Sequence, residues 1–328
     1  MSGRGQAAGW SPAGPAADLD SAPANDAPVS SDRFPIWVLA SHIQPMRSTG
    51  VRSPATERPM PARFEVPTEQ PHTALITIDR PAEANALDPE TLRDLATHWA
   101  RINEDRTIRV AILTGAGDSV FCAGMDMRKT IPASQALARG EQIDPGDFEG
   151  LRAVGHATLT KGGLRVPLIA AVNGHARAGG FDLMLASQIR YAVPAATFAL
   201  EEVALGLYPT GQATVVLPRQ IAAVHAAELL YTAKPIDAER ALAIGLLNEL
   251  LPADRLLDRA FETAGQIAAN APLAVQETLR GVRELEGMDL EAAYARQEEL
   301  GRPLRRSEDA REAQRAFLDK RPPRFFGR

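Results

Sequence analysis

Four short apolar runs between positions 72 and 193 each end at a turn signal. Aliphatic and β-branched residues bounded by Pro, Gly or Asn are typical of strands, so the sequence predicts a strand at each run. The third run, PLIAAV, is almost wholly apolar, and we expect it to be buried on both faces. The predicted strands cover residues 72–78, 110–114, 167–172 and 189–193.

Helical periodicity fills the segments between these strands. Asp88 and Pro89 predict the start of a helix, with Asp88 as the N-cap and Pro89 in the first turn. Apolar residues then recur at the spacing of one helix face as far as Ile102. A second helix is expected over residues 179–187, directly after a loop of small residues. The order β-α-β-α-β predicts parallel strands joined by right-handed crossovers.

Beyond about Pro209 the pattern becomes almost entirely helical, with one last short strand expected at residues 245–250. A helical layer of this length on an α/β core often serves subunit contact. The predicted helical segments are 212–232, 237–244, 253–270, 272–286, 289–300 and 307–319.

The N-terminal part has a different composition from the rest of the chain. Residues 1–60 are rich in Ala, Pro, Gly and Ser without a sustained period, so we expect a disordered tail. Within it, the apolar segment 34–40 is interpreted either as a small docking strand or as a weakly packed piece. We therefore predict three parts: the tail 1–60, an α/β core over 61–255, and a helical region over 256–328.

Composition and charge exclude several classes of protein. The 328-residue chain has a net charge of −5 and a pI of about 5.8, so we expect no nucleic-acid partner. No run approaches the roughly 18 apolar residues of a membrane span, and no secretory signal is recognisable. The single cysteine, Cys122, excludes an intramolecular disulfide, and a cytoplasmic location is expected. No cluster has the spacing of a metal site, so no metal is predicted.

Three segments carry the candidate chemistry. The helix predicted at Gly179 begins with two glycines, and the first amides of a helix have no internal partner. Because the helix N-terminus is also partly positive, a negatively charged oxygen can approach Gly179 and Gly180 closely. Gly124 frees the backbone beside Met125 in the same way. Two such amides would form an oxyanion hole, in which each donor is typically worth about 10²–10³ in rate. The three segments are FCAGMDMR at 121–128, NGHARAGGFDL at 173–183 and TFALEEVALG at 197–206.

In order and spacing these segments resemble the crotonase superfamily, the enoyl-CoA hydratases and isomerases. The first two are similar to its oxyanion-hole motifs, and residues 79–81 with 85–87 look like its opening. The resemblance runs from about Ala74 to the C-terminus. It implies an α/β fold, the crotonase (ClpP-like) spiral of repeated ββα units over 61–255. It also implies an α-helical C-terminal trimerisation region, and hence a homotrimer or homohexamer.

The resemblance also assigns roles to individual residues. Met125 and Gly179 would donate their amides to the thioester oxygen of an acyl-CoA. Arg128 stands where the family often has a cation near the CoA phosphates, although a plain surface charge is nearly as good an interpretation. The residues implied to line the substrate path are Asp126, Met127, Arg128 and Gly180.

Two carboxylates complete the implied site, Asp182 and Glu202. Two carboxyl groups in one apolar cleft split their pKa values, which gives one acid and one base. Together they can hold a water and move its proton across a double bond. We assign the proton at the α-carbon to Glu202 and the orientation and activation of the water to Asp182.

Three departures from the family pattern stand out. Asp182 replaces a glutamate and is shorter by one methylene, about 1.5 Å, and misplacement on that scale can cost about 10²-fold in rate. Glu201 stands where a proline usually precedes the second glutamate. Residues 210–213, TGQA, replace a glycine-rich turn and are expected to reshape the acyl pocket.

The favoured function is that of an enoyl-CoA hydratase, a hydro-lyase that adds water to a trans-2-enoyl-CoA of the fatty-acyl type. No separate cofactor is implied, because CoA arrives as part of the substrate. The alternatives are an isomerase, a carnitinyl-CoA-type dehydratase, and a non-catalytic acyl-CoA-binding protein. Residues 207–209 and 271–275 look like those of actinobacterial relatives, some of which act on bulky steroid thioesters.

Overall fold

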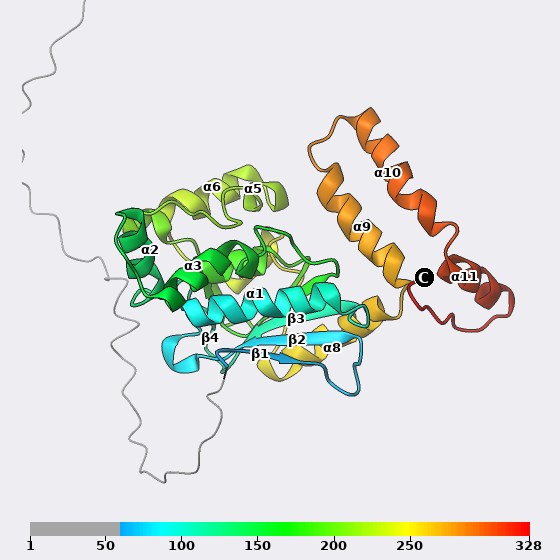
Figure 1. Ribbon diagram of the computed structural model, residues 1–328, viewed down its shortest axis with the longest axis horizontal. Coiled ribbons are helices and arrows are strands. Elements are labelled where there is room, and N and C mark those ends of the chain that lie inside the picture. Colours follow the sequence, from blue (N-terminus) through cyan, green and yellow to red (C-terminus); the bar gives the residue numbers. More distant parts are fainter. Residues whose placement is uncertain (1–59) are drawn as a thin grey trace, which may run out of the picture. The chain divides into compact units, whose positions relative to one another are not determined.

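Two β-sheets form the centre of the computed structural model, which describes residues 60–328 (Figure 1). The larger sheet has the strand order β1-β2-β3-β5-β7-β10 and the smaller one the order β4-β6-β8-β9. The predicted tail, apart from Met60, and the segment 34–40 within it lie outside the described residues. The strands are β1 (Ala62–Glu65), β2 (Thr73–Ile78), β3 (Val110–Gly115), β4 (Val120–Cys122), β5 (Leu168–Val172), β6 (His175–Arg177), β7 (Ile189–Ala192), β8 (Thr197–Ala199), β9 (Ile236–Asp237) and β10 (Glu249–Leu250).

The parallel arrangement predicted from the sequence is confirmed. Strands β2, β3, β5 and β7 pair in parallel, and every residue of β5 is buried, as its apolar sequence requires. Antiparallel pairs occur where β1 joins β2 and where β9 joins β8. Central parallel strands lie between covering layers, which explains why their residues are apolar throughout.

The chain passes through both sheets in a repeating order. Strands β3, β5 and β7 lie in the larger sheet, and the strand that follows each of them, β4, β6 and β8, lies in the smaller sheet. Successive turns therefore stack strand upon strand in both sheets. This is the repeating spiral that the sequence resemblance implies.

Helices cover the sheets. Helix α1 begins as predicted, with the Thr91 amide donating to Asp88 Oδ1 at 2.9 Å and Pro89 as its first residue. It packs on α3, where Trp99 Nε1 donates to the Ala157 carbonyl at 2.9 Å. The helices of the core are α1 (Pro89–Glu104), α2 (Thr130–Ala138), α3 (Pro145–Ala157), α4 (Gly179–Leu185), α5 (Leu217–Gln220), α6 (Ala223–Thr232) and α7 (Ala238–Ala243).

The C-terminal part is helical, as expected. Helix α8 packs against β2, β3, β5 and β7, and α9 lies beside α10 (Figure 1). None of the helices within residues 60–328 is long and apolar enough to cross a membrane. The predicted boundaries of the three parts stay a prediction. The last helices are α8 (Ala253–Ala268), α9 (Pro272–Leu285), α10 (Leu290–Leu304) and α11 (Glu308–Leu318).

Two predictions from periodicity need correction. The single helical segment predicted at 212–232 is broken, because the chain becomes extended at Ile221 between α5 and α6. The loop predicted between Asn173 and the helix at Gly179 contains strand β6. A strand of three residues is too short to show an alternating pattern, and for the same reason β4 and β8 escaped detection.

Asn85 ties together the turns that lead to the smaller sheet. It is fully buried, has a φ of 53°, and its Nδ2 donates to the carbonyls of Ala116 at 3.0 Å and Val120 at 2.7 Å. Its Oδ1 accepts from the Arg80 amide at 3.0 Å. Asparagine tolerates this left-handed conformation better than other residues with a Cβ.

Replacing Asn85 with alanine should lower the free energy of unfolding by about 2–4 kcal/mol, because three backbone groups lose a buried partner. Chemical denaturation measures this change. Asn270→Ala, at an exposed position, is the control and should stay within about 0.5 kcal/mol of the wild type. Equal stabilities of the two variants would contradict this role for Asn85.

Candidate active site

The two glycine segments predicted from the sequence meet at one point. Gly124 has a φ of +89°, and a Cβ added there would lie 3.0 Å from the Gly179 nitrogen. A Cβ added at Gly179 would lie 3.5 Å from Gly124 Cα and 3.6 Å from Met125 Cε. The parallel pairing of β4 with β6 brings these segments together, because each follows directly after one of the two strands.

The Met125 amide is left free by the backbone ladder beside it. Leu87 donates to the Gly124 carbonyl at 2.8 Å and accepts from the Asp126 amide at 3.1 Å. In a parallel ladder the groups of the residue between these two, Met125, point to the other side of its segment. Within residues 60–328 no acceptor engages the Met125 amide, so this amide is free to donate a hydrogen bond to a ligand.

The Gly179 amide is free for a different reason. Gly179 is the first residue of α4, and the first amides of a helix have no acceptor within it. The residue before it, Ala178, has a φ of 44° and a ψ of −119°, a rare conformation for a residue with a Cβ. Its amide is held by the Ala199 carbonyl at 3.0 Å. This sharp turn aims the start of α4 at the Met125 side, where one oxygen atom could accept from both amides.

Asp182 is buried one turn into α4. Its Oδ1 accepts from the Ala213 amide at 2.8 Å, and the Gln212 amide also donates to the carboxylate. Burial, with a further contribution from the charge of Glu202, raises the pKa of Asp182 from 3.8 to about 7 despite these two donors. The carboxyl can therefore gain or lose a proton near neutral pH, as a general acid or base must.

Gly211 makes the position of Asp182 possible. A Cβ added at Gly211 would lie only 1.9 Å from Asp182 Oδ2. The main chain of residues 211–213 thus lies directly against the Asp182 carboxylate, and no side chain fits at Gly211 while the carboxylate keeps this place. The two departures from the family pattern, the aspartate and the unusual turn, fit each other.

Glu202 follows β8 and starts a 3-10 helix, η3 (Glu202–Leu205). Its Oε2 is buried and has no hydrogen-bond partner among the described residues. Burial and the neighbouring charge of Glu201 raise the pKa of Glu202 above its usual value. A buried carboxylate oxygen without a partner is rare in native proteins, and a water or ligand held at this atom would satisfy it.

The four residues predicted to line the substrate path occupy different environments. Asp126 is buried, pairs with Arg80 at 3.1 Å, and accepts from the Arg128 amide at 2.8 Å. Met127 and Arg128 are exposed on the next turn. Gly180 packs against β4, since a Cβ there would lie 2.1 Å from the Cys122 carbonyl oxygen. The geometry thus gives Asp126 and Gly180 structural contacts and leaves Met127 and Arg128 accessible.

Arg80 and Arg177 had no predicted role, yet both hold site segments in place. Arg80 contacts Asp88 at 3.5 Å as well as Asp126, which fixes the segment that carries Met125. Arg177 contacts Glu201 at 3.2 Å. The sequence signal was present, because Arg80 lies in the Asp-Arg-Pro opening and Arg177 inside the second motif. Asp126 and Glu201, however, are 46 and 24 residues away from these arginines along the chain.

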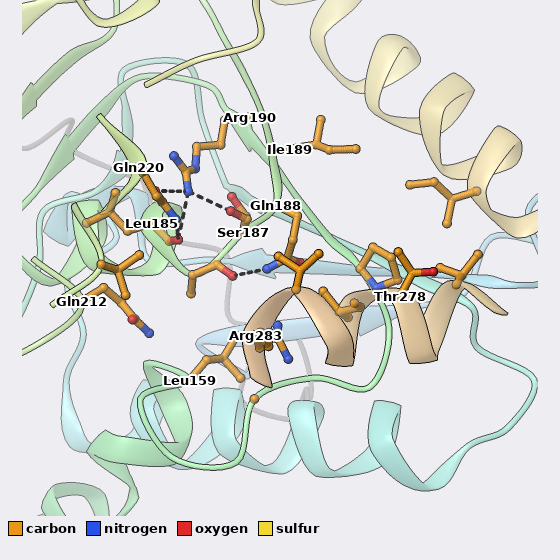
Figure 2. A pocket seen from close by; sticks show the side chains of 18 of the residues that line it. Leu159, Leu185, Ser187, Gln188, Ile189, Arg190, Gln212, Gln220, Thr278 and Arg283 are labelled. Carbon is orange, nitrogen blue, oxygen red and sulfur yellow. Dashed lines mark hydrogen bonds between the residues drawn. The ribbon is translucent and has the colours of Figure 1, made fainter. Parts of the chain in front are cut away.

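A separate cavity of about 1520 Å³ lies between α9, the turn after α4 and residues 212–220 (Figure 2). None of the predicted site residues lines it. Its buried arginine, Arg190, donates to the carbonyls of Met184, Leu185 and Ser187 and to Gln220 Oε1. The guanidinium is therefore occupied with structural contacts and is not a free ligand group.

The sequence profile of the enoyl-CoA hydratase/isomerase family matches residues 68–328. The chain is 40% identical over 257 residues to enoyl-CoA hydratase EchA19 of Mycobacterium tuberculosis, covering 78% of this chain and 94% of that protein. It is 38% identical to (E)-benzylidenesuccinyl-CoA hydratase of Thauera aromatica, covering 82% of this chain and 100% of that one. The crystal structure of enoyl-CoA hydratase EchA1 from Mycobacterium marinum superposes with a TM-score of 0.71 at 38% identity, over 82% of this chain and 100% of that chain.

The raised pKa of Asp182 makes a prediction about stability. A carboxyl whose pKa is higher in the folded state than its ordinary 3.8 is destabilising once it ionises. Its favourable contribution is present at low pH and is lost as pH rises from about 4 to about 7. Asp182→Asn, which cannot ionise, should therefore raise the thermal unfolding temperature more at pH 8 than at pH 5, with a gain of roughly 1–4 kcal/mol at pH 8.

Thermal unfolding of the wild type and of Asp182→Asn, each at pH 5 and at pH 8, tests this prediction. Asp258→Asn, at an exposed position, is the matched control and should change stability equally little at both. A gain for Asp182→Asn that is the same at pH 5 and pH 8 would show that the carboxyl is not perturbed.

Proposed function

The chain belongs to the enoyl-CoA hydratase/isomerase family, and we propose that it adds water to the double bond of a trans-2-enoyl-CoA. The observation that carries this proposal is the buried Asp182 carboxylate, held by the Ala213 amide, together with Glu202, whose buried Oε2 has no partner among the described residues. Such a pair can hold one proton between its members, and its titration belongs to the pair rather than to either residue. Two free backbone amides, at Met125 and Gly179, supply the second element that the reaction needs.

The proposed chemistry follows from this arrangement. The thioester oxygen accepts from the Met125 and Gly179 amides, which stabilise the negative charge that develops on it. A water held by the carboxylates attacks the β-carbon and gives a proton to Asp182, while Glu202 delivers its proton to the α-carbon. The carbonyl then reforms, and transfer of the proton from Asp182 to Glu202 restores the starting state. CoA is part of the substrate, so the reaction needs no separate cofactor.

We propose that the turn after Met125 binds the CoA part of the substrate. Within residues 60–328 no ion pair engages the Arg128 guanidinium, and Arg128 and Lys129 flank a hollow of about 580 Å³. Lys129 is instead paired with Asp88 at 2.9 Å. An exposed arginine suits the bidentate binding of a phosphate. We therefore assign Arg128, rather than Lys129, to the CoA phosphates.

We also propose a homotrimer or homohexamer in the cytoplasm. Exposed large apolar side chains on the C-terminal helices support subunit contact there. The buried free thiol of Cys122 suits a reducing compartment. The exposed side chains are Val282, Leu290, Tyr294, Phe317 and Leu318.

A hydratase assay tests the proposal. The wild type should remove the conjugated-thioester absorbance of crotonyl-CoA, a long-chain enoyl-CoA or a steroid enoyl-CoA. Glu202→Gln should lower kcat by about 10²–10⁴-fold, because the amide cannot deliver the proton. The matched control is Glu239→Gln, at an exposed position, which should leave kcat unchanged.

The outcomes separate the hydratase from its rivals. Full activity in Glu202→Gln would exclude the proposed roles of the pair. If the wild type consumes none of the three substrates but still binds acyl-CoA measurably, an isomerase or a binding protein would be favoured. Turnover of carnitinyl-CoA without turnover of any of the three enoyl-CoA substrates would favour a carnitinyl-CoA dehydratase, the activity named for a 38%-identical relative from Proteus mirabilis.

The fit between Gly211 and Asp182 gives a separate prediction. Gly211→Ala should lower kcat by about 10²-fold, because the new methyl group displaces the carboxylate by roughly 1 Å or more. Gly301→Ala, where an added Cβ meets nothing within 4 Å, is the control. Steady-state kinetics with the best of the three substrates measures the effect. An unchanged kcat in Gly211→Ala would mean that the carboxylate is not held as described.

A further inference from the structure

An ion pair beside the proposed catalytic acid joins the two halves of the site. Arg177 ends β6, two residues before Gly179, and Glu201 directly precedes Glu202. The Arg177 Nη1 and Glu201 Oε1 atoms are 3.2 Å apart, and the two side chains are only 17% and 21% exposed. One partner therefore lies on the segment that leads to the Gly179 amide, and the other on the segment that carries Glu202.

The pair is held in place by its own neighbours. Arg177 Nη2 donates to Thr197 Oγ1 at 2.8 Å, and Thr197 Oγ1 lies 2.8 Å from His175 Nδ1. Since Thr197 accepts from Arg177, its hydroxyl proton is free to donate to His175 Nδ1. Burial and the charge of Arg177 lower the pKa of His175, which disfavours a second positive charge in the cluster. The cluster contains one positive and one negative charge, which balance each other.

The segment after β8 is anchored by the buried Leu200 but has few polar contacts. The last ladder pair between β6 and β8 joins Arg177 to Ala199, so Glu201 and Glu202 lie beyond the paired strands. Residues 203–206 are exposed, and helix α6 is packed against η3. A partly buried ion pair placed between the end of the ladder and Glu202 is thus in the position to fix where that side chain points.

The charges around Glu202 come from few groups. Asp182 faces it from α4, and Glu201 lies next to it. The titratable groups of α6 are the exposed Tyr231 and two residues, His225 and Glu228, that contact Arg240 at 3.1 Å and 3.6 Å. Arg177 therefore acts on Glu202 mainly by neutralising Glu201.

We propose that the Arg177–Glu201 ion pair is a positioning device that holds Glu202 in register with the Gly179 amide and balances the negative charge beside it. This inference rests on the proposed function of Glu202 as proton donor. It makes Arg177 and Glu201 positioning residues, since neither touches the reacting atoms. Removing Glu201 and removing Arg177 should shift the pKa of Glu202 in opposite directions. A purely structural contact would not produce opposite shifts.

The test compares Glu201→Gln with Arg177→Met by kcat and KM from pH 5 to pH 9. Hydration requires protonated Glu202 beside ionised Asp182, so the alkaline limb of the profile reports the loss of the proton that the pair shares. Without the charge of Glu201, Glu202 ionises more readily, and the limb should move to lower pH. Without Arg177, Glu201 is unbalanced, and the limb should move to higher pH. Each shift should be about a few tenths of a pH unit. Both variants should also lose about tenfold in kcat with little change in KM.

Controls make the result specific to this pair. Arg177→Lys keeps the charge and should restore the wild-type limb. Arg259→Met breaks a comparable ion pair with Glu249, 2.9 Å long, on α8 and β10, and should leave the profile unchanged. Shifts of the same sign in Glu201→Gln and Arg177→Met, or no shifts in an active enzyme, would overturn the inference while the proposed function stands.

A second measurement keeps the test independent of turnover. Glu202→Gln is introduced into the wild type, Glu201→Gln and Arg177→Met, and the resulting change in unfolding temperature is measured against pH. This change depends on whether Glu202 is protonated in the folded protein, because a pKa that differs between the folded and unfolded states makes stability depend on pH. Glu202→Gln should begin to alter the unfolding temperature at a lower pH in the Glu201→Gln background than in the wild-type background. In the Arg177→Met background it should begin to do so at a higher pH. If the wild type lacked hydratase activity, the proposed function would fail, and the absence of these opposite shifts would separately exclude the pair's effect on Glu202.

Discussion

The close approach of two backbone segments, at Gly124 and Gly179, is the constraint on which the rest of the site depends. A side chain on Gly124 would press on the Gly179 nitrogen, and one on Gly180 would overlap the Cys122 carbonyl. With hydrogen atoms at these positions, β4 and β6 can pair and α4 can start directly against β4. The direction of α4 is then fixed, and with it the point in space at which Asp182 emerges.

The carboxyl groups show the opposite physics, since they occupy an environment that disfavours their charge. Asp182 and Glu202 are both withdrawn from water, and the two amides that contact Asp182 only partly offset this. Such an arrangement stabilises neither the fold nor the ionised carboxylates. It persists because neighbouring elements over-determine it: the ladder of β6 and β8, the turn at residues 211–213 and the Arg177–Glu201 pair.

Much of this could be inferred from the sequence, and the limits have physical causes. Strong local signals were sufficient for the central strands and for the start of α1, where Asp88 caps the helix. The resemblance of the glycine motifs to the oxyanion-hole motifs of the family implied that the Met125 and Gly179 amides act together, although the pairing of β4 with β6 that brings the two segments together was not predicted. Strand β6 was missed since three residues carry no period. The partnership of Arg177 with Glu201 spans 24 residues, and the fit of Gly211 to Asp182 depends on a main-chain path that local sequence does not encode.

The contact between Asp182 and Gly211 also bears on how this site can change over generations. A side chain at 211 has no room while the Asp182 carboxylate stays where it is, because a Cβ there would lie 1.9 Å from Asp182 Oδ2. Each position therefore determines which residues the other can accept. A sequence that gains a side chain at 211 must therefore also change the residue at 182 or move its carboxylate. The glycine at 211 and the aspartate at 182 are thus expected to change together rather than one at a time.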